Sequence, residues 1–363
     1  MGTGAPVRRV KLLRVCVTVT LGIAGGLMYV LCAGSRGVLT GRCDLRGYPL
    51  DATELNLKGC SLTHLSADIL SFSHLKKLDL ADNELSDLPI LPPSLEILFL
   101  LNNEFTRVPR SVARMPRLRM LSFKGCKLHS IGKLPRSLVW LILTGNLLRE
   151  LPREIGNLTR VRKLMLSNNR LSSLPRSMLR LKDLELLRIA NNNIQELPEW
   201  LFSLPKLSWL AVAGNPAVPP APPRSSLLDV KYSDISFGER LGEGTSSVVA
   251  RAQWRREIVA VKMYKSEVSS DGRNIDEIRA SCAVDHPNIL RFFGFYTSPS
   301  LGALLEWAPD LKSLGKPPSM DSVTRDTYPV GLMFEAGVIF RVALCIARAG
   351  AHLHSMSISH GDL

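Results

Sequence analysis

Residues 161–169 read VRKLMLSNN, and residues 184–192 repeat the pattern as LELLRIANN. Both follow LxxLxLxxN, in which valine or isoleucine can replace a leucine and an asparagine closes the motif. The motif recurs along the chain, and its closing positions are Cys60, Asn83, Asn103, Cys126, Asn146, Asn169, Asn192 and Asn215. From Cys60 onward these positions are spaced 23, 20, 23, 20, 23, 23 and 23 residues apart. This regularity predicts about eight structural repeats within residues 51–218.

Each repeat is expected to contribute one short strand whose leucines point inward. No repeat can bury that face alone, so neighbouring repeats must stack. The closing asparagine can satisfy backbone groups at the turn, because its side chain carries both donors and acceptors. Cysteine does this more weakly, so Cys126 predicts a softer turn. The two 20-residue units carry Leu91-Pro92-Pro93 and Leu134-Pro135, which predicts extended rather than helical outer sides.

The repeats resemble the leucine-rich repeat family, which has Asn or Cys at the closing position. The resemblance implies an α/β solenoid that binds a protein partner. Function would lie at the strand positions between the inward leucines, which face the concave side. From the third to the sixth repeat these positions are apolar, and they are Ile97, Phe99, Leu101, Met120, Trp140, Ile142 and Met165. We interpret them as a partner-binding patch on an exposed face; the alternative is ordinary scattered surface hydrophobes.

A different set of motifs follows the proline-rich stretch at residues 216–223. In chain order the motifs are LGEGTSSVV at 241–249, VAVK at 259–262, Glu277, HPNI at 286–289, LLEWA at 304–308 and HGDL at 360–363. A glycine-rich loop alone is a weak signal, but the ordered set is specific. Across residues 232–363 it resembles the protein kinase catalytic domain.

This second resemblance implies an α+β kinase-like domain, of which the chain holds the N-terminal lobe and the start of the next, with ATP as the phosphoryl donor. Phosphoryl transfer depends mostly on positioning and charge stabilisation. Lys262 would hold the α- and β-phosphates and pair with Glu277, and Asp362 would be the catalytic base. The residues expected to contact ATP are Leu241, Gly242, Gly244, Val249, Ala260, Lys262, Glu306 and Ala308. The expected acceptors are protein hydroxyls, of serine or threonine rather than tyrosine.

Two features depart from the family pattern. Gly361 stands where the family has an arginine that meets a phosphate on the activation loop, so control by that route is not expected. The chain also stops at Leu363, before the asparagine and the Asp-Phe-Gly motif that hold Mg²⁺ in a complete domain. We therefore expect a truncated domain that has no metal ligands and is inactive alone. The alternative function is a non-catalytic repeat scaffold that carries a pseudokinase remnant.

The truncation also predicts that one apolar helix face lacks a cover. The residues on this face are Val338, Val342, Ile346 and Leu353.

Val15 to Ala33 is a run of 19 residues without a charge, preceded by four basic residues. As a helix it would be about 28 Å long, close to the hydrocarbon thickness of a bilayer. Residues 1–35 are therefore predicted to hold a membrane anchor. A cleaved signal stays an alternative because small residues follow at 33–35, and so does a buried segment. Residues 36–50 lead into the repeats, and residues 219–231 form a proline-rich linker.

Apolar residues make up 45% of the chain, which excludes wholesale disorder. The net charge of +14 is uneven, because residues 219–363 hold 16 basic and 16 acidic residues. A basic cluster from Arg107 to Arg136 is interpreted as solvated surface or as a contact with anionic lipid. Nucleic acid is not expected as a partner, because no aromatic residues interleave with this charge.

The seven cysteines show no CxxC or zinc spacing, which favours a reducing compartment. The repeats also appear without flanking cysteine caps, and kinases need cytosolic ATP. We therefore expect a membrane-anchored protein whose domains both face the cytosol. A cytoplasmic protein and a secreted protein are the alternatives.

Overall fold

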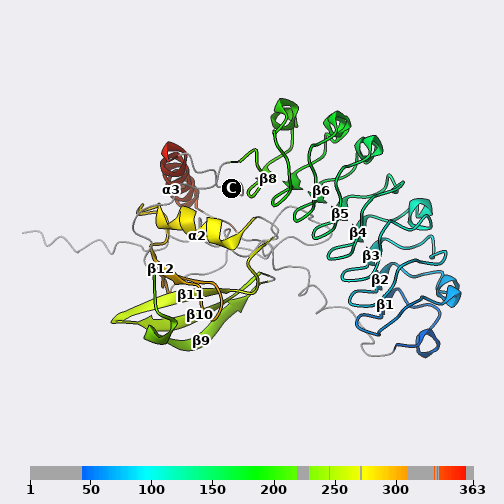
Figure 1. Cartoon of the computed structure of the whole chain (residues 1–363), viewed down its shortest axis with the longest axis horizontal. Coiled ribbons are helices and arrows are strands. Elements are labelled where there is room, and N and C mark those ends of the chain that lie inside the picture. The colour runs from blue at the N-terminus through cyan, green and yellow to red at the C-terminus, as the bar shows by residue number, and fades with distance from the viewer. Residues whose placement is uncertain are drawn as a thin grey trace, which may run out of the picture. The chain divides into compact units, whose positions relative to one another are not determined.

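The computed structural model describes residues 43–218, 229–244, 246–269, 272–309, 331, 333 and 335–356. The chain divides into two compact units. One holds the strands β1 to β8, and the other holds β9 to β13 with the helices α2 and α3 (Figure 1).

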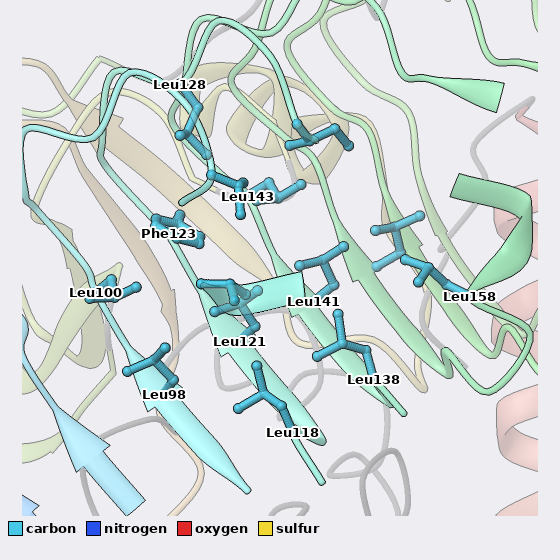
Figure 2. Packing of buried hydrophobic residues seen from close by; sticks show 14 of the residues in the cluster. Leu98, Leu100, Leu118, Leu121, Phe123, Leu128, Leu138, Leu141, Leu143 and Leu158 are labelled. Atoms are coloured by element: carbon cyan, nitrogen blue, oxygen red, sulfur yellow. The ribbon is translucent and has the colours of Figure 1, made fainter. Parts of the chain in front are cut away.

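The first unit is a solenoid built on one parallel sheet, as the repeat pattern predicts. Its eight strands are adjacent in chain order. They are β1 (Glu54–Asn56), β2 (Lys77–Asp79), β3 (Ile97–Phe99), β4 (Met120–Ser122), β5 (Trp140–Ile142), β6 (Lys163–Met165), β7 (Leu186–Arg188) and β8 (Trp209–Ala211). The register pairs the central leucine of each strand with that of the next, so Leu98, Leu121 and Leu141 stack in a fully buried row (Figure 2).

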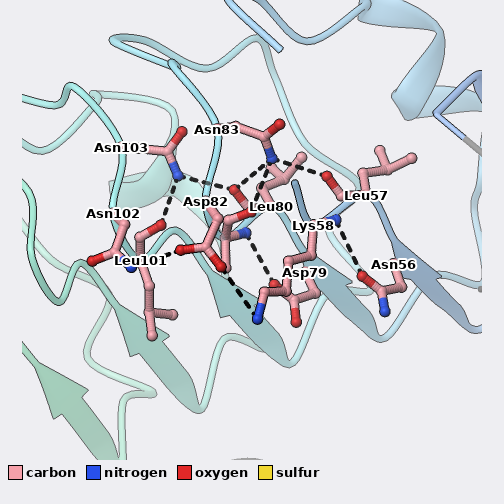
Figure 3. Close-up of polar contacts among 11 residues, drawn as sticks. Asn56, Leu57, Lys58, Asp79, Leu80, Asp82, Asn83, Leu101, Asn102 and Asn103 are labelled. Atoms are coloured by element: carbon pink, nitrogen blue, oxygen red, sulfur yellow. Dashed lines mark hydrogen bonds and ion pairs between the residues drawn. The ribbon is translucent and has the colours of Figure 1, made fainter. Parts of the chain in front are cut away.

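The closing asparagines tie each repeat to its neighbours. The side-chain amide of Asn83 donates to the carbonyl oxygens of Leu57 and Leu80 at 2.9 Å and of Ala81 at 3.1 Å (Figure 3). Its Oδ1 accepts a bond from the backbone N–H of Leu62 at 3.0 Å. One buried side chain therefore satisfies backbone groups in two successive repeats, which the leucines cannot do. The same set recurs at Asn103, Asn146, Asn169 and Asn192.

Cys126 occupies an asparagine position with fewer bonds. Its Sγ donates to the carbonyl of Leu100 at 3.2 Å, in place of the three donor bonds that Asn103 makes. Burial raises the pKa of the Cys126 thiol to about 11, so the sulfur stays protonated and keeps this donor. The weaker turn expected at Cys126 has this physical basis.

A second periodic position went unnoticed in the sequence. The residue before each closing position adopts a left-handed backbone, with φ between 51° and 74°. These residues are Gly59, Asp82, Asn102, Gly125, Gly145, Asn168, Asn191 and Gly214. Glycine, asparagine and aspartate tolerate this conformation best. At Gly125 a Cβ atom would lie 2.2 Å from Oδ1 of Asn102, so a larger residue there would require the Asn102 side chain to move.

The outer sides of the repeats follow their length. Each 23-residue unit carries a short 3-10 turn, and these turns are η3 (Ala67–Ser71), η4 (Val112–Arg114), η5 (Arg153–Asn157), η6 (Arg176–Arg180) and η7 (Glu199–Ser203). The two 20-residue units have no helical turn on this side. The predicted extended outer sides are confirmed.

The N-terminal end of the solenoid is closed by a disulfide between Cys43 and Cys60, next to the turn η2 (Leu45–Gly47). The prediction that the repeats lack a cysteine cap was wrong. The two cysteines are 17 residues apart in the sequence. They meet because the first repeat folds back, which brings their Cα atoms to 5.4 Å from each other. The cysteine spacings typical of CxxC motifs and zinc sites do not identify such a pair. Disulfides persist mainly in oxidising compartments, so this bond does not favour the predicted reducing compartment, which stays a prediction.

The second unit contains one antiparallel sheet in the order β12-β13-β11-β10-β9. Its strands are β9 (Ile235–Glu243), β10 (Ser247–Trp254), β11 (Glu257–Tyr264), β12 (Phe292–Tyr296) and β13 (Gly302–Glu306), preceded by the turn η8 (Tyr232–Asp234). One face packs around Val259, Val261 and Leu304. The other packs in part against α2 (Asn274–Cys282) through Ile278. The expected α+β lobe is confirmed, and its sheet is antiparallel.

The exposed apolar face of the helix α3 (Ala336–Ser355) is not the face that was predicted to lack a cover. Val338, Val342 and Ile346 are half-buried and Leu353 is buried, whereas the exposed apolar side chains are Ile339, Phe340 and Leu344. The predicted stripe is therefore partly covered, and the loop after α2 contacts the same helix.

Two contacts join that loop to α3. The His352 ring stacks on His286 at 5.1 Å, and the amide of Asn288 donates to the Cys345 carbonyl at 3.2 Å. Among the described residues, α3 has the length and composition that a membrane-spanning helix needs. The anchor predicted at residues 15–33 lies outside them.

The asparagine bonds predict unequal effects of substitution along the solenoid. Asn169→Ala removes its amide bonds to three carbonyls and leaves the N–H of Leu148 without this acceptor, while the carbonyls of Leu143 and Leu166 keep the amides of the neighbouring closing asparagines. We expect the free energy of unfolding to fall by about 3 kcal/mol. Cys126→Ala removes one donor bond and is expected to cost about 1 kcal/mol. Urea unfolding followed by circular dichroism compares the two. Equal losses would contradict the view that the bonds of the closing side chain determine its contribution.

The disulfide predicts redox-dependent stability of the first unit. Cys60→Ser opens the cross-link between residues 17 apart and should lower the free energy of unfolding by about 3 kcal/mol. Dithiothreitol should lower the melting temperature of the unmodified chain to that of the variant. Cys345→Ser, which removes an unlinked thiol, serves as the control. If dithiothreitol leaves the melting temperature of the unmodified chain unchanged, the bond does not form.

Candidate functional site

The predicted site residues of the second unit gather on one face of its sheet. Residues opposite each other in an antiparallel pair share a face, and so do residues two apart on a strand. Val249 pairs with both Gly242 and Lys262, and Ala260 precedes Lys262 by two residues on β11. The register thus brings together a glycine, two small apolar side chains and a lysine from three strands.

Lys262 is buried and ion-paired. Its Nζ donates to Oε1 of Glu277 at 2.6 Å, and its side chain is only 7% exposed. Glu277 lies on α2, 15 residues further along the chain, and its side chain is 28% exposed. A buried ammonium requires such a partner, because its desolvation is otherwise unfavourable. The predicted pairing of these two residues is therefore realised in the structure.

The position of Glu277 depends on how α2 begins. The side-chain amide of Asn274, which is 2% exposed, donates to the Ser266 carbonyl at 2.7 Å. The Asn274 backbone N–H donates to the Glu267 carbonyl at 2.9 Å. These bonds fix the first residue of α2 to the segment that follows β11. Ile278 then packs into the sheet, which directs its neighbour Glu277 toward Lys262.

Tyr264 is a site residue that the motif analysis missed. It lies two residues after Lys262, on the same face, and its ring centroid is 4.8 Å from Lys262 Nζ. Burial first, then the negative charge of Glu277 and a hydrogen bond with it, raise the pKa of Tyr264 well above its usual value. The strand alternation could have identified it, because positions 260, 262 and 264 share one face.

The turn between β9 and β10 carries the glycines of the loop motif. The Gly244 N–H donates to the Ser247 carbonyl at 2.8 Å, and Nζ of Lys265 donates to the Gly244 carbonyl at 2.8 Å. Lys265 also forms an ion pair with Glu243, which stands between the two glycines. No atom lies within 4 Å of a Cβ built on Gly242, so the backbone at that point has open space beside it.

The remaining predicted residues fall into two groups. Leu241 is 37% exposed at an irregularity in the pairing of β9, and Ala308 is half-buried just after β13. Glu306 ends β13, and its Oε2 accepts a bond from the Arg291 N–H at 3.2 Å. Asp362, the expected catalytic base, lies outside the described residues.

The face around Lys262 combines a buried charge with open backbone, and its described residues supply no set of metal ligands. It presents a buried cation, the open backbone at Gly242 and the half-buried side chains of Val249 and Ala260. Within the ranges described, no three His, Cys, Asp or Glu side chains come together to hold a metal ion.

The apolar patch predicted on the repeats is less open than expected. The register places Ile97, Met120 and Trp140 side by side across β3, β4 and β5. Met120, Ile142 and Leu101 are buried, with 1%, 3% and 7% exposed. The other four, Ile97, Phe99, Trp140 and Met165, are half-buried. Side chains that adjoin on neighbouring strands cover one another, so residue type alone overestimated their exposure.

Comparisons with known families agree with both units. The family model for Leucine rich repeat matches residues 159–216, and that for Protein kinase domain matches residues 235–363. The chain joins leucine-rich repeats to a protein kinase domain. The buried Lys262–Glu277 pair lies within the kinase match, and the asparagine-linked strands β6 to β8 lie within the repeat match.

Similar proteins share only part of their length with this chain. It is 30% identical over 138 residues to human mitogen-activated protein kinase kinase kinase 7, covering 37% of this chain and 21% of that protein. It is 28% identical over 147 residues to a probable serine/threonine-protein kinase of Dictyostelium discoideum, covering 39% and 11%. Among solved structures, the leucine-rich effector YopM of Yersinia pestis has 30% identity, covers 48% of this chain and 54% of that chain, and gives a TM-score of 0.38.

The coupling of Tyr264 to Glu277 predicts a change in titration. Glu277→Gln removes a negative charge, so the pKa of Tyr264 should fall toward its usual value. Because the folded pKa of Tyr264 is raised, its contribution to stability is present below about pH 10 and is lost at higher pH.

Tyrosinate absorbance across the alkaline range measures this shift, with Tyr264→Phe subtracted to remove the other tyrosines. Asp276→Asn changes the neighbouring carboxylate on α2 and serves as the matched control. An identical Tyr264 titration in Glu277→Gln would exclude the coupling.

Proposed function

We propose that the kinase domain of this protein transfers a phosphoryl group from ATP to protein serine or threonine hydroxyls, and that the repeats select the partner. The observation that supports this most directly is the buried Lys262–Glu277 pair on the face that also holds Gly242, Val249 and Ala260. A lysine held at a strand by a helix-borne glutamate is the arrangement that kinases use to position phosphates.

ATP would supply the phosphoryl group, and the residues of this face would bind and orient it. Lys262 would offer its positive charge to the phosphates, steadied by Glu277. The open backbone at Gly242 allows a close approach of phosphate oxygens, and Val249 and Ala260 would pack on the adenine. Asp362 remains the proposed base. Because no group of metal ligands is found in the described part of the chain, we assign no residue to Mg²⁺.

The choice of serine or threonine follows the similar protein of Dictyostelium discoideum, whose name describes it as a probable serine/threonine-protein kinase. Partner binding by the concave residues, contact of the basic cluster with anionic lipid and anchoring through residues 15–33 are part of the proposal. A cytosolic orientation also stays a prediction. It agrees with a need for ATP, whereas the Cys43–Cys60 disulfide is typical of oxidising compartments.

Radiolabel transfer from ATP to a generic protein substrate tests the enzyme proposal. It is measured for the 363-residue chain and for a longer version that includes the family's catalytic-loop asparagine and Asp-Phe-Gly motif. We expect transfer by the longer version and its loss in Lys262→Ala and Asp362→Ala. Lys231→Ala changes an exposed lysine just before β9 and should have no effect.

The outcomes separate the two functions. An inert longer version would overturn the enzyme proposal and favour a scaffold whose repeats alone act. Transfer by the 363-residue chain that depends on Lys262 would support the enzyme and refute the expected inactivity of the shorter chain.

A further inference from the structure

The loop after α2 meets the helix α3 at a pair of histidine rings. His286 of the loop stacks on His352 of α3, with ring centroids 5.1 Å apart and ring planes 27° from parallel. Beside them, the side-chain amide of Asn288 donates to the Cys345 carbonyl of α3 at 3.2 Å. Both rings are half-buried. Histidine is the side chain whose charge ordinarily changes near neutral pH, and the proposed function gives this pair no role.

The loop itself holds the His286 ring in its neutral form. The backbone N–H of Asn288 donates to Nδ1 of His286 at 3.1 Å. A ring nitrogen can accept such a bond only while it carries no proton, whereas both nitrogens of an imidazolium are donors. Protonation of His286 therefore breaks this bond and leaves two N–H groups facing each other.

The partner ring also accommodates a charge poorly. Nε2 of His352 is buried, and it has no hydrogen-bond partner among the described residues. In the neutral ring this nitrogen can remain an unused acceptor at a modest cost. In an imidazolium it would be a buried, charged donor without an acceptor, which is much less favourable. Because the two rings are stacked, a charge on one also opposes a charge on the other.

The groups that act on His286 are basic. Burial first, and then His352 and Arg348 of α3, lower the pKa of His286. The adjacent acid of the loop, Asp285, is exposed, and so is His354, the other histidine of α3. Because the folded pKa of His286 lies below the ordinary value of about 6.5, its contribution to stability is present above that pH and is lost as the pH falls below it.

We propose that the His286–His352 stack is a pH-sensitive joint, which holds the loop after α2 against α3 at neutral pH and releases it under mildly acidic conditions. A proton on His286 removes the acceptor of the Asn288 N–H, a proton on Nε2 of His352 creates a buried donor without an acceptor, and Arg348 opposes either charge.

Release of this loop bears on the candidate active site. The helix α2 ends at Cys282, four residues before His286, and the same helix carries Glu277. Loss of the joint would therefore free the C-terminal end of the helix that holds the partner of Lys262. The inference concerns contacts within the second unit, and it does not require that this unit transfer a phosphoryl group.

Histidine titration tests the first step. The 363-residue chain is prepared with isotope-labelled histidine and followed by NMR from about pH 8 to about pH 5. Loss of one signal in His286→Asn identifies His286. We expect His286 to take up its proton below the ordinary pKa, and we expect His352→Phe, which keeps a ring for stacking and cannot ionise, to raise that pKa. A His286 that titrates at the ordinary value in the unmodified chain would overturn the inference.

Hydrogen exchange tests the release. Exchange of the backbone amides of the loop and of α3 is compared at about pH 7.5 and about pH 5.5, corrected for the intrinsic rate at each pH. We expect protection in both segments to fall about fivefold at the lower pH, while the strands of the repeats keep theirs. His286→Asn preserves an acceptor for the Asn288 N–H, so the double variant with His352→Phe should retain protection and lose its dependence on pH. His354→Asn, at an exposed position of the same helix, should keep the full dependence.

The remaining outcomes count against the joint. Equal protection at the two pH values in the unmodified chain would leave the stack as a purely structural contact. A loss at low pH that persists in the double variant would assign the effect to another group. A loss that extends to the repeats would indicate general acid unfolding instead of local release. If the double variant is unprotected at both pH values, the titration of His286 in the unmodified chain decides.

Discussion

The buried asparagine amide is the interaction on which the repeat domain depends. Hydrophobic burial favours stacking of the leucine faces but does not fix the spacing between repeats, because it has no direction. The amide of Asn83 bonds to Leu57 in the preceding repeat and to Leu80 in its own, which sets both position and rotation. A solenoid has no contacts beyond nearest neighbours, so this local constraint determines the register of the whole sheet.

The kinase domain solves a related problem with an ion pair. Lys262 lies on a strand and Glu277 on a helix, and each charge is unfavourable without the other. Asn274 fixes the start of α2 and Ile278 fixes its rotation, so the carboxylate is presented before any ligand binds. Such preorganisation is what phosphoryl transfer requires of a protein. Tyr264 adds to it through a hydrogen bond with Glu277.

The sequence was sufficient wherever a pattern repeats or a motif is ordered. Periodicity predicted the strands and their leucines, and the order of motifs predicted the sheet that carries Lys262. Contacts between single residues were not predictable in this way. The Cys43–Cys60 bond depends on how the first repeat folds back. The burial of Met120 depends on the side chains that flank it on the two adjacent strands. The left-handed backbone before each closing residue could have been predicted. The Gly, Asn and Asp residues that tolerate this conformation recur at that position in the sequence.

Cys126 has a consequence for cooperativity. In a linear array each repeat is stabilised by its own folding and by the interface with its neighbours, and cooperativity is interrupted where an interface is weak. The rung at Cys126 contributes one sulfur bond where its neighbours contribute three amide bonds. We therefore expect the array to behave as two blocks that meet at the fourth strand, with transient opening concentrated at that junction. Each block would then fold and unfold with partial independence from the other.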